Sequence, residues 1–153
     1  MKQFTLRFKE DSQRPSFVIN NGVVAMLDTG ALYPVWTKSE YALIKLLNAK
    51  SLKRIVPVSG FGGTTMGKSF RVPYLQIGEL IYSDICVVAC PGMEKVPFSI
   101  ILSSTMFQGL IYEIDTVNNC FNIAVPEKES VVRNCKILDE NNAMRILCQS
   151  QNE

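Results

Sequence analysis

The sequence predicts an all-β fold with one or two short helices. Short apolar or alternating stretches recur along the chain between turn residues, which is typical of many short strands. One helix-capping signal followed by helical spacing of apolar residues stands out, at residues 37–49. A chain of 153 residues can form one domain with a proper core but not two comfortable ones. We therefore expect one domain over residues 1–125 and a polar tail over residues 126–153.

The first hairpin is predicted by alternation and by its turn. Residues 3–8 alternate between polar and apolar, and residues 16–20 give a second strand. Asn21-Gly22 follows, the strongest short hairpin signal in a sequence. Residues 23–27 are apolar without interruption, which predicts a return strand buried on both faces.

The remaining elements follow from capping and turn signals. Thr37 and Glu40 have the spacing of a capping box, which predicts a helix from there to about Ala49. Ser103 to Thr105 can cap a short helix over residues 106–110, and Asp139 can cap another in the otherwise loosely attached tail. Further strands are expected over residues 52–58, 69–77, 80–89, 98–102, 111–114 and 120–125.

Composition and charge exclude several partners. The chain is 47% hydrophobic and 20% charged, which is typical of a globular protein, and its net charge of +2 gives no electrostatic reason to bind nucleic acid. It lacks an uninterrupted apolar window of about 18 residues, and its first residues lack the apolar core of a signal peptide. The sequence therefore predicts a cytoplasmic protein with neither a nucleic acid nor a membrane as partner.

The chain contains no histidine. This excludes Ser-His-Asp and Cys-His hydrolases and most catalytic zinc sites. Hydrolytic chemistry would have to use carboxylates, lysine or a metal held by oxygen ligands, and we expect neither a cofactor nor a metal.

The five cysteines form an odd set without a Cys-x-x-Cys motif. This spacing suggests neither a disulfide framework nor a zinc knuckle, so reduced thiols are expected. Cys86 and Cys90 lie at even spacing in an apolar run, which places them on one face of a strand and favours core packing over chemistry.

Asp28 is the main candidate for a functional residue. The apolar strand over residues 23–27 ends at this carboxylate, and Thr29 and Gly30 allow the chain to turn directly after it. An ordinary strand-ending turn would use the same residues. Aspartate is rarely buried without a partner, so its place at the end of a buried strand needs a reason, and from this tripeptide alone both interpretations stay open.

A glycine-rich hairpin tip is the second candidate. Residues 60–67 contain four glycines, Gly60, Gly62, Gly63 and Gly67, and Phe61 would be exposed there unless something binds beneath it. A plain hairpin loop and a phosphate-binding loop are the alternatives. The phosphate-binding loop is disfavoured because the tip is followed by a strand-like sequence and not by a helix.

These features together resemble the retropepsin-like aspartic proteases, the retroviral type with a single lobe. The matching parts are Met26 to Ala31 as catalytic loop, residues 60–67 as flap, and residues 100–102 with the following short helix as the strand that closes the site. The resemblance covers about residues 17–125 and implies a closed β-barrel. Two residues depart from the family pattern: Ser103 stands where a glycine is usual, and Leu32 stands where the retroviral members carry an acidic residue.

The resemblance implies a homodimeric endopeptidase that hydrolyses a peptide or protein substrate. The single Asp-Thr-Gly would require a C2 dimer in which two Asp28 carboxylates share a proton and activate water, with most activity at mildly acidic pH. Thr29 would brace the two catalytic loops and Gly30 would allow close approach. Strand residues 4–8 or 121–125 would supply much of the interface. The implied substrate-binding residues are Ala31, Gly60, Phe61, Gly62, Gly63 and Ile101.

Two other functions stay open from the sequence. A non-catalytic, retropepsin-like peptide-binding or assembly module would keep the fold without the chemistry, and the departure at Ser103 motivates it. A small β-barrel with an unrelated surface function is the third possibility.

Overall fold

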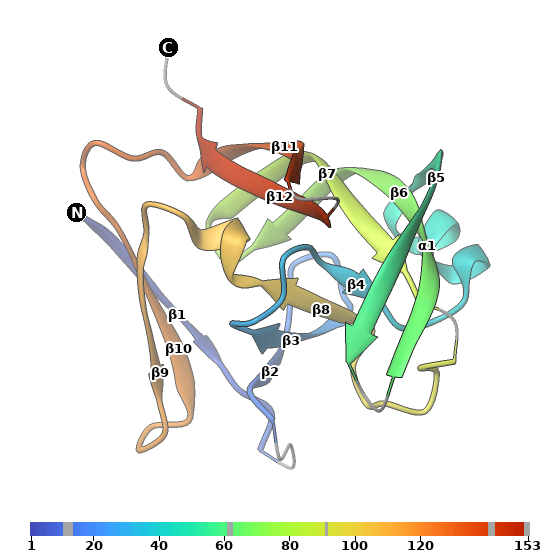
Figure 1. Ribbon diagram of the computed structural model, residues 1–153. Coiled ribbons are helices and arrows are strands. Elements are labelled where there is room, and N and C mark those ends of the chain that lie inside the picture. The colour runs from blue at the N-terminus through green and yellow to red at the C-terminus, as the bar shows by residue number, and fades with distance from the viewer. Residues whose placement is uncertain (11–13, 61–62, 91, 141–142, 152–153) are drawn as a thin grey trace.

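Strands make up most of the protein, as the sequence predicts. The computed structural model describes residues 1–10, 14–60, 63–90, 92–140 and 143–151 (Figure 1). In chain order the elements are β1 (Lys2–Arg7), β2 (Ser16–Val18), β3 (Val24–Asp28), β4 (Val35–Trp36), α1 (Glu40–Leu47), β5 (Lys50–Gly60), β6 (Gly63–Ile77), β7 (Leu80–Ala89), β8 (Ile100–Ser103), the 3-10 helix η1 (Ser104–Phe107), β9 (Ile111–Asp115), β10 (Cys120–Val125), β11 (Val132–Glu140) and β12 (Ala143–Ser150).

The described strands form two sheets. A three-stranded sheet has the order β1-β10-β9, and a nine-stranded sheet has the path β12-β11-β7-β4-β8-β3-β2, with β6 joining β5 to β7. Figure 1 shows the smaller sheet at one end of the molecule and α1 with the β5–β6 hairpin at the other. No closed barrel is found among these strands. One continuous core joins the two sheets, and its largest buried side chains include Trp36, Phe17 and Phe121.

The expected first hairpin is confirmed. Gly22 adopts a positive φ of 87°, and its amide donates to the carbonyl of Ile19, so the chain reverses where Asn21-Gly22 predicts. The return strand β3 then runs parallel to β8, with Ala25 opposite Ile100 and Asp28 opposite Ser103. Because β3 lies between β2 and β8 in the sheet, both of its edges are paired, and this placement positions Asp28.

The long helix is confirmed, but its cap differs from the prediction. Ser39 is the N-cap residue, and its hydroxyl accepts a hydrogen bond from the amide of Ala42. Thr37 is fully buried instead, and its hydroxyl donates to the carbonyl oxygen of Phe98 at 2.6 Å. A tertiary partner for the Thr37 hydroxyl therefore replaces the predicted capping box. The short helix near residue 106 is a 3-10 helix that begins two residues earlier than expected.

The last strand pair of the predicted domain, β9–β10, is confirmed together with its turn. The Asp115 carboxylate accepts hydrogen bonds from the amides of Val117 and Asn118 and from the Asn118 side chain. These hydrogen bonds lower the pKa of Asp115, the one from the Asn118 amide most strongly. The role of Asp115 in a hairpin turn is therefore confirmed.

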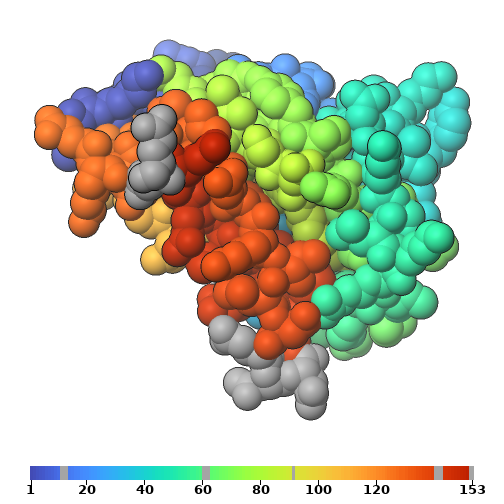
Figure 2. All heavy atoms as spheres, turned by 90° about the horizontal axis from the view of Figure 1, so that it is seen from above, coloured from blue at the N-terminus to red at the C-terminus, as the bar shows by residue number. Residues whose placement is uncertain are grey.

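The expectation of a helix near Asp139 in a loosely attached tail is wrong. Strands β11 and β12 form an antiparallel hairpin, and β11 also pairs in parallel with β7, where Val132 lies opposite Ile81. The buried residues Met144, Ile146 and Cys148 alternate along β12, which is the period of a strand and not of a helix. Figure 2 shows this hairpin (orange to red) lying against the β6–β7 region (green).

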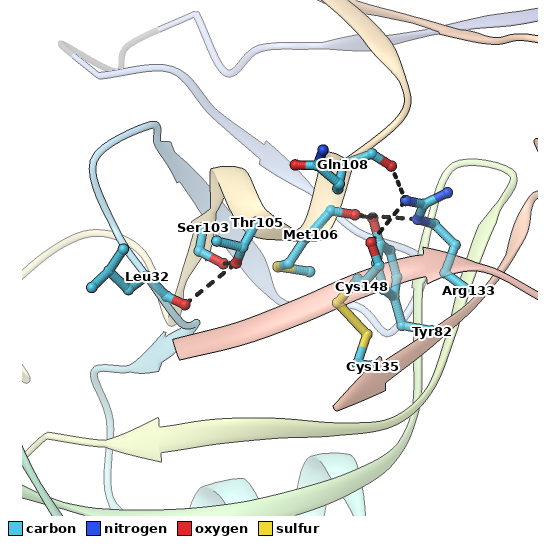
Figure 3. The surroundings of a disulfide bond; sticks show 9 residues. All are labelled: Leu32, Tyr82, Ser103, Thr105, Met106, Gln108, Arg133, Cys135 and Cys148. Carbon is cyan, nitrogen blue, oxygen red and sulfur yellow. Dashed lines mark hydrogen bonds between the residues drawn. A yellow bond between two sulfur atoms is a disulfide. The ribbon is translucent and has the colours of Figure 1, made fainter. Parts of the chain in front are cut away.

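Buried Arg133 anchors the C-terminal hairpin to η1. Its side chain is fully buried and donates hydrogen bonds to the carbonyl oxygens of Met106 at 3.3 Å, of Cys148 at 3.1 Å and of Gln108 (Figure 3). The hydroxyl of Tyr82 also donates a hydrogen bond to the carbonyl oxygen of Met106, at 2.8 Å. Burial lowers the pKa of Arg133, and the nearby Tyr82 and Glu129 oppose that shift. Hydrogen bonds to these backbone carbonyls thus offset the free-energy cost of burying the Arg133 guanidinium.

The expectation of five reduced thiols is wrong for two of them. Cys135 and Cys148 lie opposite each other in the β11–β12 register, with their Cα atoms 4.1 Å apart, and form a disulfide (Figure 3). Sequence spacing alone does not indicate this pairing, because it depends on the register of the β11–β12 hairpin. Cys86 and Cys90 are buried in the core, as predicted, and Cys120 is buried as well. Among the described residues, no helix is long and apolar enough to cross a membrane.

Candidate active site

Asp28 ends β3 in a tight turn, at the position that the sequence predicts. One of its carboxylate oxygens accepts a hydrogen bond from the amide of Gly30 at 3.0 Å, and its carbonyl oxygen accepts one from Ala31 at 3.2 Å. The side chain is only partly buried, so the carboxylate can reach solvent or a ligand. Gly30 is not among the residues with a left-handed backbone, and its contribution is the amide that fixes the Asp28 side chain.

A cavity of about 630 Å³ lies between the loop that contains Asp28 and the glycine-rich hairpin. This volume lies within the usual range of ligand sites. Asp28 lies on one side of the cavity, and the strands of the β5–β6 hairpin and Ile101 of β8 complete it. Its described lining residues are Asp28, Gly30, Ala31, Leu32, Tyr33, Val35, Val56, Pro57, Val58, Ser59, Gly63, Thr64, Thr65, Cys90, Gly92, Met93, Ile101, Ala143 and Met144.

Most of the predicted site residues that the structure describes meet at this cavity. Asp28, Gly30, Ala31, Gly63 and Ile101 line it. Thr29 is exposed and is not among the lining residues. Gly60 ends β5 and pairs with Gly63. The two other predicted substrate-binding residues, Phe61 and Gly62, lie outside the described residues.

Tyr33 holds the β5–β6 hairpin, which the sequence predicts to act as a flap, close to its tip. The Tyr33 hydroxyl donates a hydrogen bond to the carbonyl oxygen of Pro57 on β5 at 2.7 Å. Burial raises the pKa of Tyr33, and Cys90 and Cys86 add to this effect, so the phenol stays a hydrogen-bond donor near neutral pH. The loop that follows Asp28 and the flap are therefore connected directly.

Close packing against β7, the neighbouring strand in the sheet, requires a glycine at position 67 of β6. A Cβ atom at this position would lie 2.5 Å from a methyl carbon of Val88 and 2.9 Å from the carbonyl oxygen of Ala89. The three described glycines of this hairpin therefore differ in role: Gly67 permits close contact with the sheet, whereas Gly60 and Gly63 form the last described pair at the tip.

The cavity is mainly apolar around one carboxylate. Among the described lining residues, Asp28 is the one with a charged side chain. Cys90 is also in the lining, and burial raises the pKa of its thiol, which keeps it protonated and poorly nucleophilic. Acid–base chemistry in this cavity would therefore depend on Asp28. Elsewhere in the described parts of the chain, no cluster of three or more His, Cys, Asp or Glu could hold a metal ion.

Ser103, the departure from the family pattern, lies directly beside Asp28. It pairs with Asp28 across β3 and β8, and its side chain is fully buried. Its hydroxyl lies 2.7 Å from that of Thr105, which in turn donates to the carbonyl oxygen of Leu32 at 3.3 Å (Figure 3). Ser103 therefore begins a short polar chain beneath the loop that follows Asp28.

Sequence reasoning missed the wall contributed by β12. Ala143 and Met144 line the cavity, and the amide of Ile146 donates to the carbonyl oxygen of Leu32 at 3.0 Å. The alternation of Met144, Ile146 and Cys148 is the signal that could have identified this strand.

The chain was compared with known proteins. No family model matches it, and no characterised protein matches it significantly in sequence.

Proposed function

We propose that this protein is a retropepsin-like aspartic endopeptidase that acts as a homodimer. The observation that carries the proposal is the position of the Asp28 carboxylate at the end of a buried strand. It accepts a hydrogen bond from the Gly30 amide and lines a cavity of about 630 Å³ together with the strands of a glycine-rich hairpin. The retropepsin-like fold and a cytoplasmic location are parts of the same proposal; the Cys135–Cys148 disulfide is the feature that argues for an oxidising compartment instead.

The proposed chemistry needs two carboxylates. Two aspartates within a few ångströms cannot both ionise cheaply, so one of the two Asp28 residues would hold a proton while the other is charged. The charged one would take a proton from water as the water oxygen bonds to the peptide carbonyl carbon, and the protonated one would give its proton to the carbonyl oxygen. In the breakdown of this diol intermediate, the aspartic acid formed in the first step would give its proton to the amide nitrogen, the other carboxylate would take a proton from a diol hydroxyl, and the C–N bond would break to give a carboxylic acid and an amine. Each chain has one Asp-Thr-Gly, so the second aspartate would come from the other subunit.

The cavity and flap suit a peptide. Mainly apolar walls would take the side chains of an extended segment, and closure of the β5–β6 hairpin would exclude water from the two carboxylates. Strand edges also bear on dimerisation. In the described sheet, β10 is paired on both edges, whereas β1 is paired on one. Of the two strands that the sequence suggests for the interface, β1 is therefore the better candidate for pairing with a second copy.

The test is cleavage of a randomised decapeptide library, analysed by mass spectrometry, together with the mass of the protein in solution. Wild type should be a dimer and should cleave peptides. Asp28→Asn should abolish cleavage and keep the dimer, because the amide preserves the shape but does not titrate. When the two proteins are mixed and allowed to exchange subunits, activity should fall with the square of the wild-type fraction.

Asp84→Asn is the matched control. Asp84 is an exposed carboxylate on β7 that pairs with Arg71 outside the cavity, so its loss should leave cleavage unchanged. Cleavage by Asp28→Asn, or activity of a strictly monomeric wild type, would refute the proposed mechanism.

A non-catalytic peptide-binding module is the second candidate. Buried Ser103 beside Asp28 favours it, because a glycine is usual at this position in the family that the sequence resembles. Wild type that binds library peptides without cleaving them would support this candidate.

A further inference from the structure

The start of β12 forms one wall of the candidate active-site cavity. Ala143 and Met144 lie in the same lining as Asp28 and the flap strands. Met144 is 5% exposed, so its side chain is packed into the core at the edge of the cavity and is not free in solvent. Ala143 is exposed. A bound molecule that reaches this end of the cavity would therefore touch the C-terminal hairpin.

Three separate interactions hold this wall in place. The amide of Ile146 donates to the carbonyl oxygen of Leu32, which ties β12 to the loop after Asp28. The Cys135–Cys148 disulfide joins the two strands of the hairpin, and Arg133 connects β11 to η1 through backbone carbonyls. A side chain supported in this way presents a defined surface, which is what selectivity among ligands requires.

We infer that the C-terminal hairpin sets the substrate preference of this site, with Met144 as a specificity-determining residue for an apolar side chain of the bound peptide. This inference rests on the proposed function in taking the ligand to be a peptide. The thioether of Met144 is apolar and polarisable, and it can adapt to aliphatic or aromatic groups. Asp28 is the one charged side chain among the described lining residues, so this end of the cavity offers no counterion for a charged peptide residue.

Two substitutions should change the preference in opposite directions. Met144→Ala enlarges the cavity, so peptides with a large aromatic residue at one position should gain over those with a small aliphatic one. We expect the ratio of kcat/KM for the aromatic peptides to kcat/KM for the aliphatic peptides to rise by at least about tenfold, mainly through KM. One methylene group more or less in an apolar pocket changes kcat/KM by about this factor. Ala143→Leu fills the cavity from an exposed position, so it should favour small residues without removing anything from the core.

Ile137→Ala is the matched control. Ile137 lies on β11 of the same hairpin, directly opposite Ile146, but it lines a separate pocket with Leu52 and Arg71. This substitution also shortens an apolar side chain of the hairpin, and it should leave the peptide preference unchanged.

The experiment compares side-chain preference at each peptide position for wild type and the three variants, using the decapeptide library. The same profile is measured by binding, with Asp28→Asn and Asp28→Asn/Met144→Ala as capture proteins. A change at one peptide position in Met144→Ala, with the opposite change in Ala143→Leu, supports the inference. If Met144→Ala does not fold, Ala143→Leu alone decides.

The outcomes separate this inference from the proposed function. Cleavage with unchanged profiles in both Met144→Ala and Ala143→Leu would overturn the inference and leave the protease proposal standing. Selective binding that Met144→Ala changes, without cleavage by wild type, would support the inference and overturn the catalytic proposal. Absence of both cleavage and binding would overturn both.

Discussion

The Tyr33 hydroxyl donates a hydrogen bond to the carbonyl oxygen of Pro57, and this bond joins the loop after Asp28 to the β5–β6 hairpin close to its tip. Tyr33→Phe removes only the donor. We expect the free energy of unfolding to fall by about 0.5–1 kcal/mol, the usual value of one hydrogen bond that is not deeply buried. Amide exchange near Pro57 should become several-fold faster, because this end of the β5–β6 hairpin loses its contact with the loop after Asp28. Urea unfolding and hydrogen exchange measure the two effects.

Tyr41→Phe serves as the control for Tyr33→Phe. Tyr41 lies on the exposed face of α1, where its hydroxyl accepts a hydrogen bond from Lys45. This variant should leave exchange in β5 unchanged. Equal exchange rates in Tyr33→Phe and wild type would mean that the hydrogen bond does not hold the flap.

Arg133 should be among the most sensitive positions outside the cavity. Arg133→Met keeps an apolar side chain of similar length but leaves buried carbonyls, including that of Met106, with fewer donors. We expect a loss of roughly 3 kcal/mol in the free energy of unfolding, measured by urea denaturation. Arg71→Met removes an exposed arginine that pairs with Asp84 and should cost at most about 1 kcal/mol. Similar losses in the two variants would contradict this role of Arg133.

The Cys135–Cys148 disulfide predicts the number of reactive thiols. Alkylation of the unfolded protein without prior reduction should modify three of the five cysteines, Cys86, Cys90 and Cys120, and mass spectrometry counts them. Replacing both bonded cysteines by serine should lower stability by about 3 kcal/mol, because the closed loop no longer restricts the unfolded chain. With dithiothreitol present, the variant and wild type should unfold at nearly the same urea concentration. Five modified cysteines in the unreduced protein would show that the bond is absent.

The turn between β9 and β10 should contribute to stability in a pH-dependent manner. Hydrogen bonds from Asn118 and Val117 lower the pKa of Asp115 in the folded state. The ionised carboxylate therefore stabilises the fold above the unfolded value of about 3.9, and this contribution is lost as the pH falls through the lower folded pKa. Asp115→Asn keeps an acceptor oxygen but does not titrate, so its stability should fall less than that of wild type between pH 5 and pH 2.5.

Urea unfolding at a series of pH values tests the Asp115 prediction. A residual dependence of the same sign should remain in Asp115→Asn, because a hydrogen bond from Arg54 lowers the pKa of Asp139 as well. Identical pH profiles for wild type and Asp115→Asn would rule out a contribution from the turn carboxylate.

The parts of the fold that the sequence predicts correctly are those with short-range causes. Asn21-Gly22 sets its own turn, and the apolar strand before Asp28 needs only local sequence to be recognised. The hairpin turn at Asp115 is another example, since its hydrogen bonds reach no further than Asn118.

The errors arise where a distant partner decides. Thr37 has the spacing of a helix cap, but its hydroxyl donates a hydrogen bond to the carbonyl oxygen of Phe98 instead. Ser39 is the N-cap residue of α1. Arg133 has the sequence character of a surface residue, yet carbonyls from η1 and β12 allow it to be buried. The cavity wall is a mixed case: the alternation of Met144, Ile146 and Cys148 could have identified β12 as a strand, but its contact with Leu32 depends on a distant partner.

The position of Met144 late in the chain has a consequence for biosynthesis. A ribosome makes Asp28, the flap strands and Ile101 well before it makes β12, and chains begin to fold from the N-terminal side as they emerge. A nascent chain that ends before β12 lacks the wall of the cavity and the bond from Ile146 to Leu32. The cavity is therefore complete only after β12 has been translated, more than 40 residues after Ile101, which delays its assembly relative to that of the other cavity walls.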